Sequence, residues 1–255
     1  MTLKLSAFTC GTITADYGRL MVGGEGEITI PMESFLIEHP KGTAVFDTGL
    51  HPLCRTDPVA HLGAENARRF KPVLGQGEDV AGRLEAIDRD PAKIDFIVTS
   101  HLHFDHVGGN ALIPNATLVI QRREWEAGRD IELAKRAGLD PDHFDHGHTI
   151  RAVDGEHDLF GDGSVVCLPT YGHTPGHQSV RLRLPGGDVV LVGDACYFCR
   201  SLAERRLPRY VYDAEQMLHS YDRLEALQRQ GARLIFGHDP GQWAAIPQAP
   251  ETVAF

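Results

Sequence analysis

SHLHFDHVGGN, residues 100–110, is the most informative stretch of the sequence. It follows the apolar run IDFIV, which predicts a buried strand. His101 and His103 would point the same way just beyond that strand, since alternate residues of an extended chain share a side. Asp105 and His106 would then turn toward a neighbouring point, so that one short loop can serve two metal positions. The two glycines of the stretch permit a tight chain reversal close to such metals.

Three further predicted strands end in residues of the same chemical classes. The run VVCLPTYG leads into His173, DVVLVG leads into Asp194, and ARLIFG leads into His238. Strand-end loops commonly carry functional groups, and imidazole with carboxylate suits zinc, or else Co, Mn or Fe. A lone histidine is more often an ordinary hydrogen-bonded residue, but the complete set predicts a metal site. Two ions about 3.5–4 Å apart can share a hydroxide that serves as a nucleophile.

Composition and charge exclude several other functions. A formal net charge of −10 argues against nucleic acid as the main partner, because nucleic-acid binders usually present a basic face. No apolar run approaches the length of a membrane span, and the start MTLKLSAFTCG lacks the apolar core of a signal peptide. The five scattered cysteines fit a reducing compartment better than a disulfide framework. We therefore expect a cytoplasmic protein with no membrane span.

The remaining pattern indicates an α/β fold. Neither an internal repeat nor a dividing linker is found, so residues 1–255 are predicted to form a single domain. Strand pairs mixed with strand–helix units favour layers with more than one sheet. Asp213, with Gln216 three residues later, predicts the start of a helix that ends at Gly231. The Gly-rich segment MVGGEGEITIP, residues 21–31, is predicted to be a loop.

The motifs SHLHFDHVGGN, GHTPGH, GDA and GHD together resemble those of the metallo-β-lactamase superfamily. The resemblance covers most of the chain, from about FLIEHPKGTAVFDTG to GHDP. It implies an αββα four-layer sandwich with a dinuclear metal site at the edge of the two sheets. Within the superfamily, the chain looks most like the N-acyl-homoserine lactonases, the quorum-quenching enzymes. That narrower match rests on Phe104 within HLHFDH, on Tyr197 three residues after Asp194, and on the short single-domain length.

The resemblance also implies how the ligands are shared between two zinc ions, for which Co, Mn or Fe can substitute. One ion would be held by His101, His103 and His173, and the other by Asp105, His106 and His238, with Asp194 bridging them. Asp47 would orient a metal-bound histidine, and His177 would support the ligands or serve the structure. An aspartate at position 194 argues against the β-lactam-hydrolysing branches, where that position is often a cysteine.

The implied reaction opens the ring of an N-acyl-homoserine lactone by attack of a bridging hydroxide. Tyr197 would stabilise the oxyanion, because donors already positioned in a dry site favour developing charge. Asp105 is either the proton donor to the leaving alkoxide or a ligand only. Phe104, and less securely Leu20 and Met21, would line the groove for the acyl chain. The small-molecule lactone would be the partner of this site, and the resemblance also suggests a homodimer.

Other functions are compatible with the same ligands. A glyoxalase-II-like thioester hydrolase or an organophosphate hydrolase would use this metal site, although Tyr197 and Phe104 favour the lactonase. A metal-free binding module would not need the complete ligand set. The segment DPDHFDHGH, residues 140–148, is interpreted as a solvated loop rather than a second metal site. The pair Cys196 and Cys199 is interpreted as packing residues rather than a redox motif.

Overall fold

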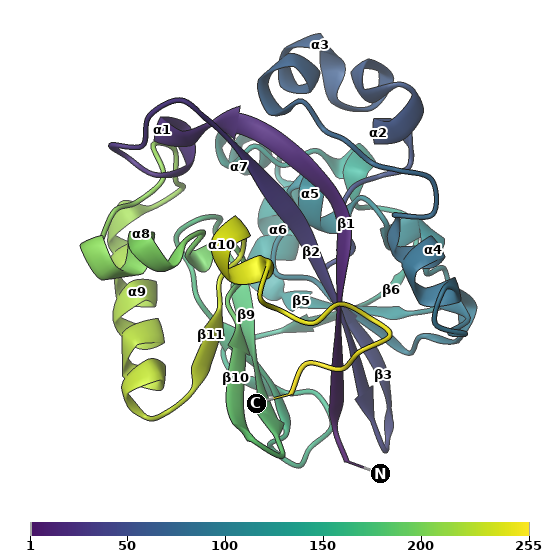
Figure 1. Ribbon diagram of the computed structural model, residues 1–255. Coiled ribbons are helices and arrows are strands. Elements are labelled where there is room, and N and C mark those ends of the chain that lie inside the picture. The colour runs from purple at the N-terminus through teal and green to yellow at the C-terminus, as the bar shows by residue number, and fades with distance from the viewer. Residues whose placement is uncertain (1, 255) are drawn as a thin grey trace.

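The computed structural model describes residues 2–254 and contains two β-sheets (Figure 1). The larger sheet has the strand order β1-β2-β3-β4-β5-β6, and the smaller has the order β11-β10-β9-β8-β7. The strands of the larger sheet are β1 (Lys4–Asp16), β2 (Glu27–His39), β3 (Gly42–Phe46), β4 (Phe96–Val98), β5 (Thr117–Gln121) and β6 (Thr149–Val153). Those of the smaller sheet are β7 (His157–Asp158), β8 (Val165–Pro169), β9 (Gln178–Leu184), β10 (Gly187–Leu191) and β11 (Arg233–Ile235).

The helices cover the outer faces of both sheets, with α9 lying along β11 and α4 on the opposite side of the molecule (Figure 1). The α-helices are α1 (Tyr17–Leu20), α2 (Leu53–Thr56), α3 (Pro58–Phe70), α4 (Val80–Glu85), α5 (Phe104–Val107), α6 (Arg122–Arg129), α7 (Ile131–Ala137), α8 (Cys199–Glu204), α9 (Ala214–Arg229) and α10 (Pro240–Trp243). Short 3-10 helices are η1 (Pro91–Lys93), η2 (Asn110–Leu112), η3 (Pro141–His143) and η4 (Gly193–Ala195). The predicted helix start at Asp213 is confirmed, since its carboxylate accepts from the Gln216 amide nitrogen at 3.0 Å.

Alternation along the strands explains the four layers. On β2, Phe35 and Ile37 point into the core between the two sheets, whereas Leu36 packs outward against Val80 and Leu84 of α4. On β10, alternate residues likewise divide between that central core and the cluster formed with α9. Strands that are apolar on both faces are expected where helices cover a sheet. The αββα sandwich expected from the sequence is confirmed.

The long β1–β2 hairpin is the main departure from the sequence prediction. The predicted loop at residues 21–31 is wrong in its second half, because β2 already begins at Glu27 and pairs with β1. Ile28, Ile30 and Met32 occupy alternate positions of β2 and lie in one apolar cluster, with Thr29 and Pro31 between them. That period of two is the signature of a half-buried strand. α1 and α3 flank the upper end of the hairpin (Figure 1).

Four strands deliver the candidate ligands to one end of the sandwich. β4 leads into His101, β8 leads into the loop that contains His173, β10 leads into η4, and β11 leads into His238. The four strand ends converge, since Asp194 lies within 3.7 Å of His101, His173 and His238. Within residues 2–254, no helix combines the length and the apolar character that crossing a membrane requires.

Candidate metal centre and substrate pocket

The structure brings together all seven side chains that the sequence singled out as ligands. Their ligating atoms form two groups, and within each group the atoms lie within 4.8 Å of one another. The groups are His101, His103, His173 and Asp194, and Asp105, His106 and His238. This division coincides with the sharing of ligands that the resemblance implies.

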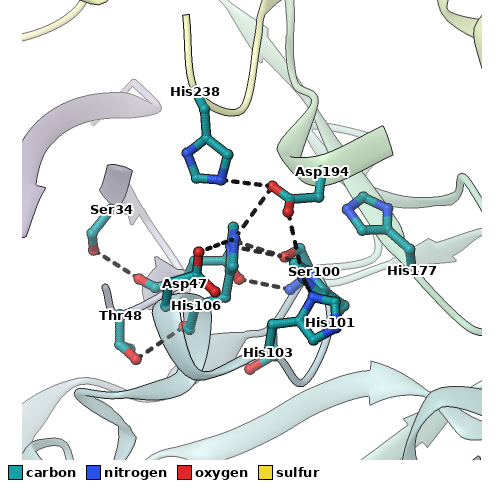
Figure 2. Close-up of polar contacts among 12 residues, drawn as sticks. Ser34, Asp47, Thr48, Ser100, His101, His103, His106, His177, Asp194 and His238 are labelled. Atoms are coloured by element: carbon teal, nitrogen blue, oxygen red, sulfur yellow. Dashed lines mark hydrogen bonds and ion pairs between the residues drawn. The ribbon is translucent and has the colours of Figure 1, made fainter. Parts of the chain in front are cut away.

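Asp194 lies between the two groups and directs one carboxylate oxygen to each (Figure 2). Its Oδ2 lies 3.2 Å from His173 Nε2 and 3.7 Å from His101 Nε2. Its Oδ1 lies 3.0 Å from His238 Nε2 and 3.2 Å from His106 Nε2. The geometry is that of a carboxylate able to bridge two cations.

Hydrogen bonds on the far side of two ligand rings fix which nitrogen faces the centre. His103 Nε2 lies 2.8 Å from the Ala137 carbonyl, and His238 Nδ1 lies 2.9 Å from the Pro31 carbonyl. A carbonyl only accepts, so each of these nitrogens carries the proton and donates it. The other nitrogen of each ring therefore presents an unprotonated lone pair to the centre, as a metal ligand must.

Asp47 orients two further rings from behind (Figure 2). Its carboxylate accepts from His106 Nδ1 at 2.8 Å, and from both the amide nitrogen and the hydroxyl of Ser100 at 2.7 Å. Because the Ser100 hydroxyl donates to Asp47, its oxygen is free to accept from His101 Nδ1 at 2.9 Å. One carboxylate thus sets a ring in each ligand group. Ser100 has no sequence signature and was not predicted.

The nitrogens that converge at the first group fit a cation. His103 Nδ1 lies 2.9 Å from His101 Nε2 and 3.0 Å from His173 Nε2. His103 Nδ1 and His101 Nε2 both lack a proton in the tautomers just derived, so no hydrogen bond can join them. Burial lowers the pKa of His101 well below its ordinary value and that of His103 to about 4, which favours the neutral rings. Neutral imidazoles with one carboxylate are the donor set of a transition-metal ion such as zinc.

The second group has a different electrostatic balance. Burial alone would lower the pKa of His106, but the carboxylates of Asp194, Asp105 and Asp47 raise it well above its ordinary value. Burial acts in the opposite sense on Asp194, whose pKa His106, His238 and His173 nevertheless hold well below its usual range. Asp194 therefore remains negative, and a positive charge at this position is favoured.

A cavity of about 240 Å³ opens directly onto these ligands. At its inner end lie Asp105, Asp194 and Tyr197, and its walls include Phe104 and Leu20. The walls also include residues that the sequence did not indicate, from the β1–β2 hairpin, α3 and the segment after α8: Ile13, Ile30, Phe70, Pro208 and Tyr210. Arg19, Asn66 and Arg69 add polar groups to the same lining. A mostly apolar lining with a few polar groups is typical of a small-molecule site.

Tyr197 is 7% exposed and stands between two ligand rings, with ring centres 5.6 Å from His173 and 5.3 Å from His238. Burial and the nearby carboxylates of Asp194 and Asp105 raise its pKa well above the ordinary value. The phenol is therefore protonated and available as a donor at the inner end of the cavity.

Two residues predicted to belong to the site, Met21 and His177, lie just outside the cavity lining and the ligand groups. Met21 is fully buried in the apolar cluster with Leu20 and Ile30, but it is not among the residues that line the cavity. His177 is fully buried with its ring centre 5.2 Å from that of His101, and its Nδ1 lies 2.9 Å from the Thr170 hydroxyl. Its Nε2 has no hydrogen-bond partner among residues 2–254. His177 therefore borders the first ligand group without joining it.

The other motifs take no part in the ligand groups. His143 is half-buried rather than solvated, with its ring centre 4.6 Å from that of His61, whereas His146 is exposed. All five cysteines, which lie in the described part of the chain, are unpaired. Burial raises the pKa of the Cys196 thiol to about 12, which makes it unreactive and favours a packing role. Cys199 is exposed, so the packing interpretation is wrong for that residue.

A two-sheet sandwich with a His/Asp ligand cluster at its edge defines a metal-dependent hydrolase. The chain belongs to the metallo-beta-lactamase superfamily, whose family model matches residues 33–238. It is 34% identical over 245 residues to the N-acyl homoserine lactonase AttM of Azorhizobium caulinodans, with 89% of each chain covered. It is 33% identical over 271 residues to a protein of the same name from Agrobacterium fabrum, with 99% of each covered. A solved N-acyl homoserine lactone hydrolase, with N-hexanoyl-L-homoserine bound at its catalytic metal centre, matches with a TM-score of 0.88 at 26% identity, covering 99% of this chain and 100% of that one.

Proposed function

We propose that this protein hydrolyses the lactone ring of N-acyl homoserine lactones with the help of two zinc ions. One observation carries the proposal: two ligand groups joined by Asp194 lie beside the protonated Tyr197 at the inner end of a mostly apolar cavity. The similarity to proteins named N-acyl homoserine lactonase supports the same substrate class.

His101, His103 and His173 would hold one zinc ion, Asp105, His106 and His238 would hold the other, and Asp194 would contact both. Bound zinc lowers the pKa of water to about 7 and polarises a carbonyl, which supplies a nucleophile near neutral pH. Asp47 would keep the lone pairs of His106 and, through Ser100, of His101 directed at the ions. His177 would support the first group from behind.

Tyr197 would donate a hydrogen bond to the lactone carbonyl oxygen as that oxygen gains negative charge. Its raised pKa keeps the proton on the phenol throughout the working pH range. Its ring is held between His173 and His238, so the hydroxyl is positioned before the substrate arrives. A preorganised donor of this kind typically contributes about 100- to 1,000-fold to turnover.

Asp105 would accept the proton of the attacking hydroxide and pass it to the leaving alkoxide when the ring opens, in addition to serving as a ligand. Its side chain is 12% exposed and lines the cavity, whereas Asp194 is 4% exposed. Its Oδ2 lies 3.9 Å from His106 Nε2, farther than the contacts that Asp194 makes. That looser environment leaves Asp105 able to reach both a metal ion and the substrate.

The apolar wall would bind the acyl chain. Phe104 packs against Phe70, with ring centres 5.3 Å apart, and both line the cavity. Leu20 and Ile30 form another part of the wall, and Met21 supports it from the buried cluster. Each methylene that leaves water in such a site contributes about 0.8 kcal/mol.

The proposal is tested by acid release from a panel of N-acyl homoserine lactones, thioesters and phosphotriesters, with zinc-loaded protein at one fixed pH. The lactones are expected to have the highest kcat/KM. Faster turnover of thioesters than of every lactone would instead identify a glyoxalase-II-like hydrolase, and preference for phosphotriesters would identify an organophosphate hydrolase.

We also propose that residues 1–255 form a single domain in the cytoplasm and that the chain forms a homodimer. The core between the sheets includes both Leu3 and Val253, which supports one domain. Five unpaired cysteines are compatible with a reducing compartment. Sedimentation equilibrium of the zinc-loaded protein would measure the oligomeric state.

A further inference from the structure

Helix α6 (Arg122–Arg129) contains an acidic residue that the proposed mechanism does not use. Glu124 lies in its first turn and is 0% exposed, although the helix is otherwise rich in charged surface residues. A buried carboxylate is unfavourable unless hydrogen bonds compensate for the lost water. Its partners therefore indicate why it is there.

Both oxygens of Glu124 accept from backbone amides of the two loops that carry the first ligand group. Oε1 accepts from the amide nitrogen of Leu102 at 3.2 Å, and Leu102 lies between His101 and His103. Oε2 accepts from the amide nitrogen of Gly176 at 2.6 Å, three residues after His173. One carboxylate thus joins two loops that are distant in sequence.

The backbone of α6 lies unusually close to the same two loops. A Cβ atom on Gly176 would lie 2.4 Å from the Glu124 amide nitrogen, closer than real Cβ contacts. A Cβ on Gly128, one turn farther along α6, would lie 2.7 Å from the Leu102 side chain. Glycine at both positions lets helix and loops touch directly, which leaves little room for the loops to shift.

We propose that Glu124 is a positioning residue that holds His101 and His103 in register with His173, and so sets the geometry of one of the two metal positions. Asp105, His106 and His238 lie on other segments, and the hydrogen bonds of Glu124 described here reach none of them. Glu124 therefore acts on the first ligand group selectively. The inference rests on the proposed function only for the expected effect on lactone turnover.

The test compares Glu124→Ala and the isosteric Glu124→Gln with the wild-type protein. Gln keeps one acceptor but turns an NH₂ group toward the other amide, so its effect should be smaller than that of Ala. The matched control is Glu126→Gln, an exposed glutamate on the same helix. Metal content and affinity are measured by titration of metal-free protein with Zn²⁺. Co²⁺ absorption spectra are compared with those of His103→Ala and His238→Ala, each of which disrupts one ligand group.

We expect one ion to bind about 10- to 100-fold more weakly in Glu124→Ala, the usual cost of losing a group that orients ligands. The remaining Co²⁺ spectrum should match that of His103→Ala, and Glu126→Gln should match the wild type. Lactone kcat should fall while KM changes little, since Glu124 does not line the cavity in the described part of the chain.

Unchanged affinity for both ions in the two Glu124 variants would overturn the inference. An equal loss of affinity for both ions, together with a lower unfolding temperature, would also overturn the inference, because these results would show that Glu124 has a general structural role. If Glu124→Ala does not fold, the same criteria are applied to Glu124→Gln. Metal binding is measured without substrate, so a wild-type protein inactive on every lactone would reject the proposed function and leave this test intact.

Discussion

Two clusters of histidine rings stand out within residues 2–254, and one of them has the arrangement of a metal site. The metal-centre histidines are His101, His103, His106, His173 and His238, and the peripheral histidines are His51, His61 and His143. Ring separations are alike, with 4.6 Å between the centres of His101 and His103 and 4.3 Å between those of His51 and His61. The interplanar angles differ, at 86° and 21° respectively. Perpendicular rings can direct lone pairs at one point, whereas stacked rings direct theirs side by side.

The two clusters also differ in what surrounds the rings. Asp194 contacts four of the metal-centre histidines within 3.7 Å and supplies negative charge. In the peripheral cluster, His51 Nδ1 instead accepts from the Leu53 amide at 3.1 Å, and His143 Nε2 donates to the His61 carbonyl at 3.2 Å. Within residues 2–254, no group of potential ligands converges there. Proximity of imidazoles is therefore not sufficient for a metal site. The ring nitrogens that face away from the centre must also be hydrogen-bonded, and a carboxylate must lie between the rings.

Asp194→Asn should have the largest effect, since it removes the charge that the two ligand groups share. We expect loss of at least one metal ion per chain and a fall in kcat/KM of about 1,000-fold or more, because charge stabilisation by metal is worth several kcal/mol. Metal analysis after dialysis and lactone kinetics measure these effects. Asp188→Asn, on the neighbouring strand β10, is the matched control and should retain both metals. An Asp194→Asn protein with full metal content would show that the carboxylate does not distinguish the clusters.

Tyr197→Phe should have the next largest effect on turnover. The variant separates the binding of metal from the catalysis that depends on it. Turnover of lactones should fall about 100-fold, the lower end of the range for loss of one oxyanion donor. Metal content should not change, because the phenol is not in either ligand group. Tyr212→Phe, a tyrosine outside the lining of the cavity, serves as the control. An unchanged kcat in Tyr197→Phe would remove the proposed role of the hydroxyl.

Asp47→Asn should have a smaller effect on metal binding, because it disturbs hydrogen bonds that orient the ligand rings but removes no ligand. Asn tolerates the left-handed conformation of this residue, whose φ is 53°, so the backbone should not be strained. In the wild type, the Ser100 amide nitrogen donates to Asp47 Oδ1, and the Ser100 hydroxyl and His106 Nδ1 donate to Oδ2. The NH₂ group of Asn must replace one of these two acceptor oxygens. We expect metal affinity to fall about 10- to 100-fold, measured by competition with a chelator. Wild-type affinity would mean that these rings are oriented without Asp47.

The seven side chains that lie together at the metal centre could be singled out in the sequence because each follows an apolar strand and belongs to a chemically distinctive residue type. The sequence could not predict the groups that accept hydrogen bonds from the ligand rings. The carbonyls of Ala137 and Pro31 are backbone groups that any residue would supply. The roles of Ser100 and Glu124 depend on contacts across the fold. The apolar wall was predicted less well, because Ile30 and Phe70 look like ordinary core residues until the β1–β2 hairpin and α3 are placed. The segment around His143 shows the reverse error, since its polar composition hid the packing of this ring on His61.

The smallest effect is expected in the peripheral cluster, and it concerns pH rather than metal. Burial, together with His143 and His51, lowers the pKa of His61 to about 4, against Asp140, which raises it. In the unfolded chain, the ring should titrate near its ordinary value of about 6.5. Between these two pH values the unfolded state binds more protons than the folded state, so the free energy of unfolding falls as pH falls.

His61→Gln should therefore flatten the decline in stability between pH 6.5 and pH 4. The gain relative to wild type should be on the order of 1 kcal/mol, because solvent screens a half-exposed ring and reduces the full effect of its pKa shift. Urea unfolding of both proteins at pH 8 and pH 5, with the same metal content, measures the difference and cancels the contribution of the metal centre. His219→Gln, an exposed histidine on α9, should leave the pH dependence as in the wild type. If His61→Gln declines as steeply as wild type, the stacked rings are not held neutral, and their contrast with the metal-centre histidines rests on ring geometry alone.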